Sequence, residues 1–313
     1  MPHKMKRSYS RIAVIGAGSV GSTLAMRIVE DGLADVVLID IFGNAARGKA
    51  MDILDSAPIM GHEQNIHGTE DYAEMRGADI VVVTAGFPRK PGMTREELTA
   101  RNAAVVKDVS LKIKTHAPSA VVIMVTNPLD AMTYLALRTT GFKRNRVMGM
   151  AGVLDGSRFV QLIASELKVP RSAVTAFMLG SHGDTMVPAL SCTRVSGKPI
   201  GGLLPPDKLA AIVKRARERG AEIVSLLGTG SAYYSPSGAV LKMARSILRD
   251  SREEMVVSAS LDGEYGLSGL AIGVPCVIGK NGIEKIIQLK LTEEEKDAFA
   301  ISASAIKGSI AQL

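Results

Sequence analysis

The chain has 313 residues, which is enough for two domains rather than one small core. Hydrophobic residues make up 46% and charged residues 22%, as in globular proteins, and no apolar run approaches the ~20 residues that a membrane helix needs. The net charge is +7, but it is dispersed, and the segment KRARER at 214–219 mixes in an acid at helical spacing. We therefore expect a solvated helix face there, with no nucleic-acid partner and no membrane partner.

The chain begins with a short basic segment that leads directly into apolar residues and a glycine pattern. No small-residue cleavage site lies between them, so we interpret this start as a leader to a first strand and not as a secretory signal. The two cysteines, Cys192 and Cys276, are far apart and form no CxxC motif. They predict neither a disulfide framework nor a zinc site, and they fit a cytoplasmic location.

Short apolar runs alternate with helical patterns through the first half of the chain. We predict strands at 11–16, 35–40, 78–86, 119–127 and 146–150. Runs this apolar suit strands that are buried on both faces, and the helical segments between them imply parallel crossovers. The sequence therefore predicts an α/β fold, with a doubly wound parallel (Rossmann) sheet over residues 1–150.

The pattern changes after about residue 150. A helix is predicted at 154–169, then a hairpin pair within 173–197, and two helices at 206–228 and 235–250. Strands with turns return between 253 and 287, and a last amphipathic helix follows Thr292, which forms a capping box with Glu295. We expect residues 151–313 to form an α+β catalytic and substrate domain.

The segment GAGSVG lies between the first strand and the first helix and fits the pattern GxGxxG. Its glycines allow a tight turn, a close approach of the backbone to a pyrophosphate and close helix packing, while the helix N-terminus supplies donors. Asp40 ends the next strand, where a carboxylate binds ribose hydroxyls and repels a 2′-phosphate. NAD is therefore the predicted cofactor. Its expected contacts in this segment are Gly16, Ala17, Gly18, Ser19, Val20 and Gly21.

Two further stretches carry ionisable side chains. His182 stands between glycines in LGSHGDTMVP, and Asp155 and Arg158 are three residues apart and so share one helix face. Such a pair could be a surface ion pair, or it could orient a histidine and bind a substrate carboxylate. The histidines at 62 and 67 lack the spacing of two ligands on one helix face, so no metal site is predicted.

The segment GFPRKPGMTREEL is predicted to be a loop that leads into a helix. It contains two arginines, Arg89 and Arg95, and Thr94 forms a capping box with Glu97. Arg95 is therefore expected in the first helical turn, and Arg89 in the loop before it.

Taken in order, these motifs resemble the lactate/malate dehydrogenase superfamily, and most closely its lactate-dehydrogenase-like malate dehydrogenases. The resemblance runs over nearly the whole chain. It rests on GAGSVG, Asp40, TAGFPRKPGMTR, the RN pair at 101–102, VTNPLD, GVLDGSR and SHGDTMVP.

The resemblance implies roles for these residues. His182 corresponds to the acid–base that takes the C2 hydroxyl proton of malate, Asp155 to the carboxylate that orients it, and Arg158 to the clamp on the C1 carboxylate. Asn127 corresponds to a residue that contacts substrate and nicotinamide. Further cofactor contacts are expected at Asn102, Val125 and Thr126.

The two loop arginines correspond to separate functions in the family. Arg95 matches the arginine that polarises the C2 carbonyl. Arg89 occupies the position at which an arginine accompanies the second carboxylate of oxaloacetate and a glutamine accompanies pyruvate. One departure is Ser181, where malate dehydrogenases commonly have glycine; we expect no change of reaction from it.

The expected function is reversible oxidation of malate to oxaloacetate with NAD, by a homodimer or homotetramer. Lactate dehydrogenase, or an enzyme of dual specificity, is the alternative within the family. A non-catalytic NAD-binding sensor is the alternative from another class. A short-chain reductase would need YxxxK, which none of the six tyrosines provides.

Overall fold

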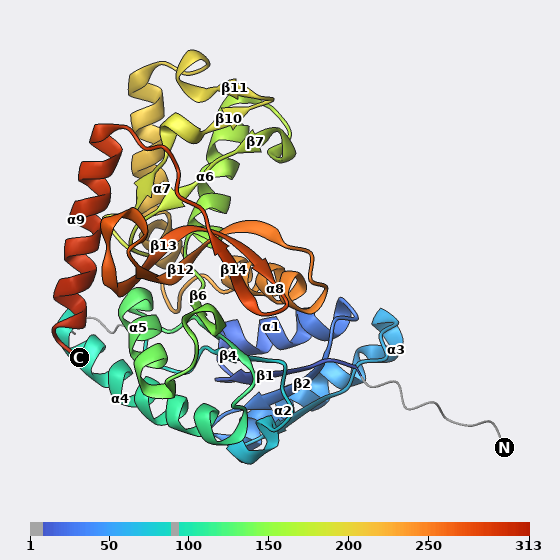
Figure 1. The fold of residues 1–313 in the computed structure, drawn as a ribbon. Coiled ribbons are helices and arrows are strands. Elements are labelled where there is room, and N and C mark those ends of the chain that lie inside the picture. The colour runs from blue at the N-terminus through green and yellow to red at the C-terminus, as the bar shows by residue number, and fades with distance from the viewer. Residues whose placement is uncertain (1–8, 89–93) are drawn as a thin grey trace.

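The computed structural model describes residues 9–88 and 94–313. Its main feature is a nine-stranded sheet in the order β14-β13-β12-β6-β5-β4-β1-β2-β3 (Figure 1). The six parallel strands are β1 (Arg11–Ile15), β2 (Asp35–Ile39), β3 (Ile66–Thr69), β4 (Ile80–Val83), β5 (Val121–Met124) and β6 (Val147–Gly149). The three antiparallel strands are β12 (Glu253–Asp262), β13 (Ser268–Gly279) and β14 (Gly282–Ile286).

Helices cover both faces of the parallel part because alternate strand residues point to opposite sides. Val14 and Val82 belong to the core on the side of α1, whereas Ile15 and Val83 belong to the core on the side of α4 and α5. The helices of this half are α1 (Ser19–Glu30), α2 (Gly43–Asp55), α3 (Ala57–Met60), α4 (Arg95–His116) and α5 (Leu129–Thr140).

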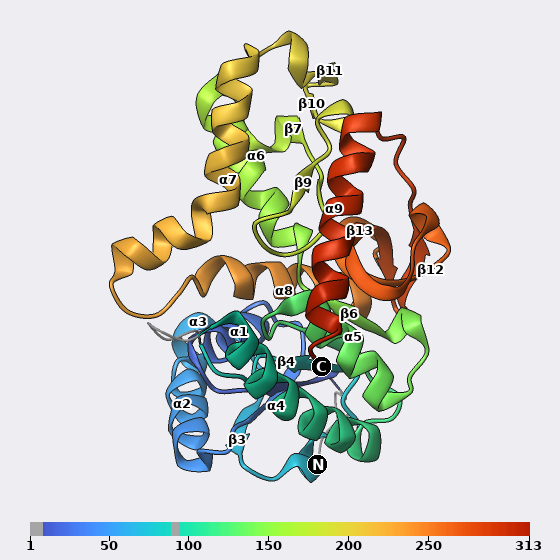
Figure 2. The same cartoon turned by 90° about the vertical axis from the view of Figure 1, so that its left-hand side faces the viewer.

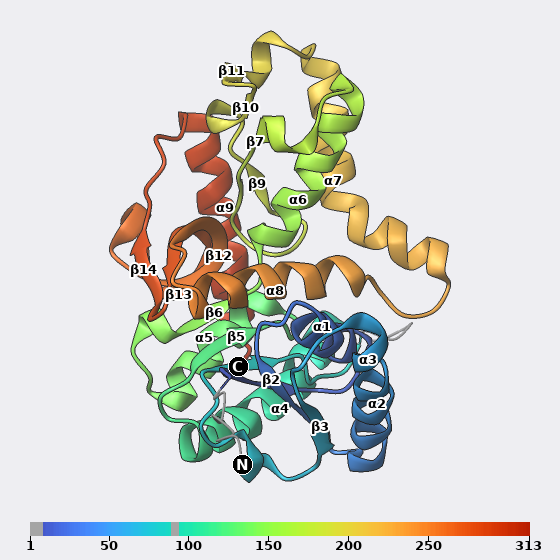
Figure 3. The ribbon, with the colours of Figure 1, turned by 90° about the vertical axis from the view of Figure 1, so that its right-hand side faces the viewer.

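The second half of the chain adds helices around the antiparallel strands and a separate small core. α8 (Tyr234–Leu248) packs on α1, and α9 (Glu293–Ile310) packs on α5 and β13 (Figures 2 and 3). α6 (Gly152–Leu167) and α7 (Pro206–Leu227) pack together around Phe159 and Ile163. The short strands are β7 (Val174–Thr175), β8 (Met178–Leu179), β9 (Val187–Pro188), β10 (Arg194–Val195) and β11 (Lys198–Pro199).

Short 3₁₀ helices lie in several connections. They are η1 (Tyr72–Met75), η2 (Arg144–Arg146), η3 (Arg171–Ala173), η4 (Leu190–Cys192), η5 (Ile200–Gly202) and η6 (Glu264–Gly266). The two predicted capping boxes are confirmed at the N-termini of α4 and α9. No helix in the described ranges combines the length and apolarity needed to cross a membrane.

The α/β class and the doubly wound parallel sheet are confirmed, with one strand missed. β3 was not predicted because IHGT has a histidine and a glycine where a buried strand would carry apolar residues. The expected hairpin pair is present as β8 paired with β9 and β7 paired with β10. The sheet itself continues past residue 150, because Ser258 of β12 pairs with Gly149 of β6. The division into two domains at 150 therefore stays a prediction.

The topology brings several loops to the carboxyl ends of the parallel strands. The turns after β1, β4 and β5 lie at this edge, which is the usual ligand site of a doubly wound sheet. The loop between β8 and β9, which contains His182, is connected to the beginning of α5 by a hydrogen bond from His182 N to Asp130 Oδ2 (2.8 Å).

Candidate active site

The glycine-rich turn after β1 has the geometry of a nucleotide-binding loop. Gly16 has φ +105°, and a Cβ there would lie 2.7 Å from the backbone nitrogen of Ala85. A Cβ on Gly21 would lie 1.8 Å from the carbonyl oxygen of Gly16, so α1 packs directly on the turn. Gly18, the N-cap of α1, offers no side-chain cap, and a Cβ there would meet nothing within 4 Å. This open N-terminus leaves backbone donors and space for the pyrophosphate of NAD.

Asp40 lies beside this turn, as the sequence predicted. Its Oδ2 accepts a hydrogen bond from Ala17 N (2.6 Å), and its Oδ1 accepts one from Phe42 N (2.9 Å). Lys49 of α2 donates to the carbonyl oxygen of Ala17. The Ala17 peptide is thus held on both sides, and the carboxylate keeps acceptor positions for ribose hydroxyls, since two oxygens offer about four.

Asn102, predicted as a cofactor contact, connects three backbone groups of the protein. Its Oδ1 accepts from Phe87 N (2.7 Å), and its Nδ2 donates to Phe87 O (3.2 Å) and Asn127 O (2.7 Å). The side chain is buried, and both amide hydrogens are used within the protein. Asn102 thus connects the segments around Phe87 and Asn127, and its contact with the cofactor stays a prediction.

The turn after β5 carries the other expected cofactor contacts. Val125 N continues the sheet by donating to Val83 O (2.9 Å), and Thr126 Oγ1 donates to Ala85 O (2.7 Å). Asn127 is exposed at the end of this turn. The backbone from Val125 to Asn127 therefore lies beside the turn that follows β4.

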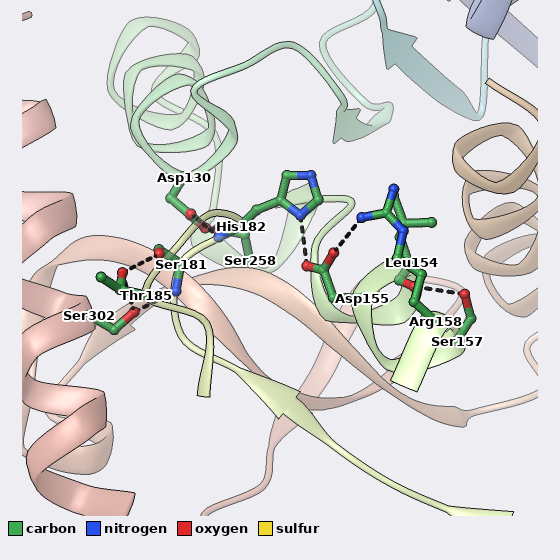
Figure 4. A network of polar contacts seen from close by, with 10 residues as sticks. All are labelled: Asp130, Leu154, Asp155, Ser157, Arg158, Ser181, His182, Thr185, Ser258 and Ser302. Atoms are coloured by element: carbon green, nitrogen blue, oxygen red, sulfur yellow. Dashed lines mark hydrogen bonds and ion pairs between the residues drawn. The ribbon is translucent and has the colours of Figure 1, made fainter. Parts of the chain in front are cut away.

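His182 and Asp155 form the hydrogen-bonded pair that the sequence could only suggest (Figure 4). Nδ1 of His182 lies 2.7 Å from Asp155 Oδ2, and the two side chains are 16% and 3% exposed. Because Nδ1 faces the carboxylate, it carries the proton in the neutral ring, and Nε2 is left as the acceptor. A histidine held in this way can accept a proton from a substrate hydroxyl.

Arg158 lies one helical turn after Asp155 on α6 and faces the other oxygen of its carboxylate. Its Nη1 is 3.4 Å from Asp155 Oδ1, which is a long contact, and its Nε is buried without a hydrogen-bond partner among the described residues. Only 12% of the side chain is exposed. A buried guanidinium with unused donors can bind a carboxylate, whose two oxygens match its geometry.

The charges around His182 favour its protonated form. Burial opposes the charge, but Asp155, through its negative charge and its hydrogen bond, and Asp130, through its charge, together raise the imidazole pKa above its ordinary value. The positive charge of Arg158 acts in the opposite direction and lowers the pKa of His182. Its own pKa is lowered, chiefly by burial and also by Arg219, although Asp155 acts in the opposite direction. The two carboxylates thus favour the imidazolium that forms when the ring accepts a proton.

The structure adds polar residues that sequence reasoning missed. Asp130 Oδ2 accepts from His182 N, Ser258 donates to Asp130 Oδ1 (2.6 Å), and Ser302 Oγ accepts from Ser181 N (2.7 Å). Ser181 and Thr185 hydroxyls lie 2.7 Å apart within the loop. Asp130 was within the quoted motif VTNPLD, but Ser258 and Ser302 carry no local signal of this role.

His182 and Arg158 line one cavity of about 890 Å³ between α6, α7 and the histidine loop. Its other ionisable lining residues are Asp184, Lys214, Arg217 and Glu218. The two loop arginines cannot be placed in it: Arg89 lies outside the described residues, and Arg95 begins α4 without a described side chain. Their roles remain predictions.

Both halves of the chain match family models. Residues 10–149 match the NAD binding domain of lactate/malate dehydrogenase, and residues 152–313 match the alpha/beta C-terminal domain of the same family. A malate dehydrogenase of Geobacillus kaustophilus is 47% identical over 311 residues, which cover 99% of both chains.

Solved structures from one organism, Cryptosporidium parvum, are similar in fold. Its malate dehydrogenase has a TM-score of 0.94 at 38% identity, covering 97% of this chain and 99% of that one. Its lactate dehydrogenase, solved with lactic acid and nicotinamide adenine dinucleotide, has a TM-score of 0.94 at 40% identity, covering 97% of each chain. With the sheet, the glycine loop and the histidine pair, these similarities show that the chain belongs to the lactate/malate dehydrogenase family of NAD-dependent oxidoreductases.

Proposed function

We propose that the chain is an NAD-dependent malate dehydrogenase, which interconverts (S)-malate and oxaloacetate. The observation that carries this proposal is the guanidinium of Arg158, which is buried beside the His182–Asp155 pair and whose Nε has no hydrogen-bond partner among the residues that the structure describes. A 2-hydroxy acid offers a carboxylate for Arg158 and, on the next carbon, a hydroxyl for His182. The relative from Geobacillus kaustophilus, which is named malate dehydrogenase, supports malate as that acid.

In malate oxidation, Nε2 of His182 accepts the proton of the C2 hydroxyl. Asp155 holds the ring by Nδ1 and stabilises the imidazolium that forms. Arg158 binds the C1 carboxylate and so fixes the hydroxyl against the ring. NAD⁺, when bound at the glycine loop, supplies the acceptor for the hydride from C2. In the reverse direction, the protonated histidine returns the proton to the carbonyl oxygen of oxaloacetate.

We assign the remaining substrate contacts from the sequence. Asn127 contacts the substrate and the nicotinamide end of the cofactor, and Arg95 polarises the C2 carbonyl. Arg89 binds the distal carboxylate, which pyruvate lacks. Because a dicarboxylate in a closed site needs a partner for each charge, Arg89 is the residue that distinguishes malate from lactate in this proposal.

The overall fold does not distinguish the two substrates. The malate and lactate dehydrogenases of Cryptosporidium parvum match this chain with the same TM-score of 0.94. Lactate dehydrogenase is therefore the second candidate, and the choice depends on Arg89 and on turnover.

We also propose that the enzyme is a homodimer or homotetramer of two-domain subunits divided near residue 150, in the cytoplasm. Large apolar side chains on α2, α3 and α7 support self-association: Met51 is 65%, Ile59 83% and Leu226 81% exposed. The two cysteines, both free, fit a reducing compartment.

The test is absorbance of the reduced nicotinamide with oxaloacetate, and separately with pyruvate, at equal concentrations. We expect rapid oxidation of NADH with oxaloacetate and a kcat/KM for pyruvate that is lower by roughly 10²-fold or more, since one uncompensated buried charge costs ~3–5 kcal/mol. Faster turnover of pyruvate would establish the lactate alternative. NADH binding without turnover of either substrate would establish a sensor.

A further inference from the structure

Lys49, in the second turn of α2, reaches from that helix to the glycine loop of the cofactor site. Its Nζ donates a hydrogen bond to the carbonyl oxygen of Ala17. α2 begins at Gly43, three residues after Asp40, and long side chains of a helix point back toward its N-terminus. The helix therefore directs Lys49 to the same turn that Asp40 approaches from the end of β2.

The positive charge of Lys49 is not explained by this contact. The bond to Ala17 uses only one of the three donors of an ammonium group, and Lys49 makes no ion pair with a carboxylate among the described residues. A neutral donor would be sufficient for one carbonyl oxygen. A compact ammonium on a flexible stem is, by contrast, a common partner of phosphate oxygens. The charge and the two remaining donors therefore point to an anionic group of the cofactor.

Asp40 and Lys49 hold the two ends of one residue of the loop. Asp40 Oδ2 accepts a hydrogen bond from Ala17 N (2.6 Å), while Lys49 donates to Ala17 O. Ala17 is buried, and two side chains of opposite charge flank it. A carboxylate at the end of this strand binds ribose hydroxyls and repels a 2′-phosphate. An ammonium beside it attracts the same phosphate, since the sign of the Coulomb energy is reversed.

The other charged side chains near the start of α2 are placed differently. Arg47 donates to Asn44 Oδ1 (2.7 Å) on the exposed side of the helix, and residues two positions apart, such as Arg47 and Lys49, do not share a helix face. Glu70 lies over the first residue of α2, where a Cβ on Gly43 would be 2.5 Å from Glu70 Oε2. Glu70 adds negative charge here, and Lys49 is the cation that the structure shows bonded to the loop.

We propose that Lys49 is a cofactor-binding residue that sets, together with Asp40, how strongly the site discriminates against a 2′-phosphate. The carboxylate repels this phosphate and the ammonium attracts it, so the preference for NAD over NADP is the difference between the two effects. The wild-type protein then binds NADPH measurably, although more weakly than NADH, and Lys49 supplies that residual affinity. The inference concerns the nucleotide and holds for malate and lactate alike.

The test is the dissociation constant of NADH and of NADPH, each measured from nucleotide fluorescence without substrate. In Lys49→Met we expect the dissociation constant for NADPH to rise by roughly tenfold more than that for NADH, the effect of one charge-assisted hydrogen bond. Lys49→Arg keeps the charge and should keep the ratio of the two constants within a few-fold of wild type. Arg47→Met is the matched control, because it removes a cation from the same helix and should lower the affinity for both nucleotides equally, if at all.

A second comparison removes the opposing carboxylate. Asp40→Ser should bind NADPH more tightly than wild type does, because the repulsion of the 2′-phosphate is lost. Adding Lys49→Met to this variant should cancel most of the gain, and the contribution of Lys49 to NADPH binding should be larger in the Asp40→Ser background. This contribution should also decrease as the salt concentration is raised, since an exposed ion pair is screened.

A ratio of the two dissociation constants in Lys49→Met that equals the ratio in Arg47→Met would overturn the proposal. So would an equal loss of affinity for NADH and NADPH, which would show that Lys49 only holds the carbonyl of Ala17. Binding is measured without turnover. The result therefore tests Lys49 even if the wild-type protein proves inactive on malate, which would contradict only the proposed function.

Discussion

The glycine loop at 16–21 and the histidine loop at 180–186 are both turns with glycines, yet they are held in different ways. The first is a short turn between β1 and α1, and the side chains that hold Ala17 come from Asp40 and Lys49, at separations of 23 and 32 residues. In the second, the partners of the backbone come from α5 and α9, at separations of 52 and 121 residues. The cofactor loop is therefore held by its glycine geometry and by the strand and helix that follow it closely in the sequence, whereas the catalytic loop is held by buried side chains from distant elements.

This difference has a consequence for substitutions. Changes in the cofactor loop should act on binding of the nucleotide, whereas changes around His182 should act on turnover with the nucleotide still bound. Four substitutions test this separation, beginning with the largest expected effect.

Arg158→Gln should reduce kcat/KM for both oxaloacetate and pyruvate by roughly 10²–10⁴-fold, because each substrate has the C1 carboxylate that Arg158 binds. NADH binding, measured from nucleotide fluorescence, should stay within a few-fold of wild type. The matched control is Arg144→Gln, since Arg144 makes an ion pair with Glu264 (2.9 Å) elsewhere. A loss confined to one substrate would show that the assignment of Arg158 is wrong.

Arg89→Gln should lose roughly 10²–10⁴-fold in kcat/KM for oxaloacetate, whose second carboxylate would lack a partner. For pyruvate, which lacks this carboxylate, kcat/KM should stay the same or rise. Arg95→Gln is the informative comparison, because the C2 carbonyl is common to both substrates and both should suffer. Equal losses in the Arg89 variant would remove the basis for malate specificity.

Asp40→Ser should weaken the preference for NAD over NADP by roughly tenfold, the effect of losing one charged contact with the ribose and its repulsion of a 2′-phosphate. Asp35→Ser is a suitable control. Asp35 lies at the other end of β2 and likewise accepts from a backbone nitrogen, Asn65 N (2.8 Å). An unchanged ratio in Asp40→Ser would mean that another residue sets the preference.

Asp130→Asn should alter how stability depends on pH. A carboxyl whose pKa rises from 3.8 to about 6 on folding contributes stability that is fully present below pH 3.8 and is lost as the pH rises through 6. That difference corresponds to at most ~3 kcal/mol. The asparagine variant lacks this titrating group. The difference in Tm, variant minus wild type, should therefore increase by a few degrees from pH 5 to pH 8. If the difference in Tm between variant and wild type is the same at pH 5 and at pH 8, Asp130 does not ionise in this range.

The same comparison explains what could be predicted from the sequence. The sheet, the glycine loop and Asp40 follow from periodicity and from a motif within thirty residues, so they could be predicted. His182, Asp155 and Arg158 could be named but not brought together without the family resemblance. Ser258 and Ser302 could not be found, because a buried serine has no pattern of its own, and only the packing of β12 and α9 places them beside the histidine loop.

Two features that the sequence did not predict have physical causes. β3 was missed because this edge strand has an exposed histidine, His67, and a glycine, Gly68, on which α2 packs so closely that a Cβ would lie 2.2 Å from the carbonyl oxygen of Ala46. The three hydrogen bonds of the Asn102 amide to backbone groups were likewise not predicted, since no local pattern indicates them, and its contact with the cofactor stays a prediction. In both cases the surrounding structure, and not the segment itself, determines the feature.

The separation of cofactor binding from proton transfer is tested most directly by measuring NADH binding and turnover on the same preparation of His182→Asn. We predict a dissociation constant for NADH within a few-fold of wild type and a kcat lower by ~10²–10⁴-fold, the contribution of general acid–base catalysis. Turnover within a few-fold of wild type, or a loss of NADH binding as large as the loss of turnover, would contradict this account.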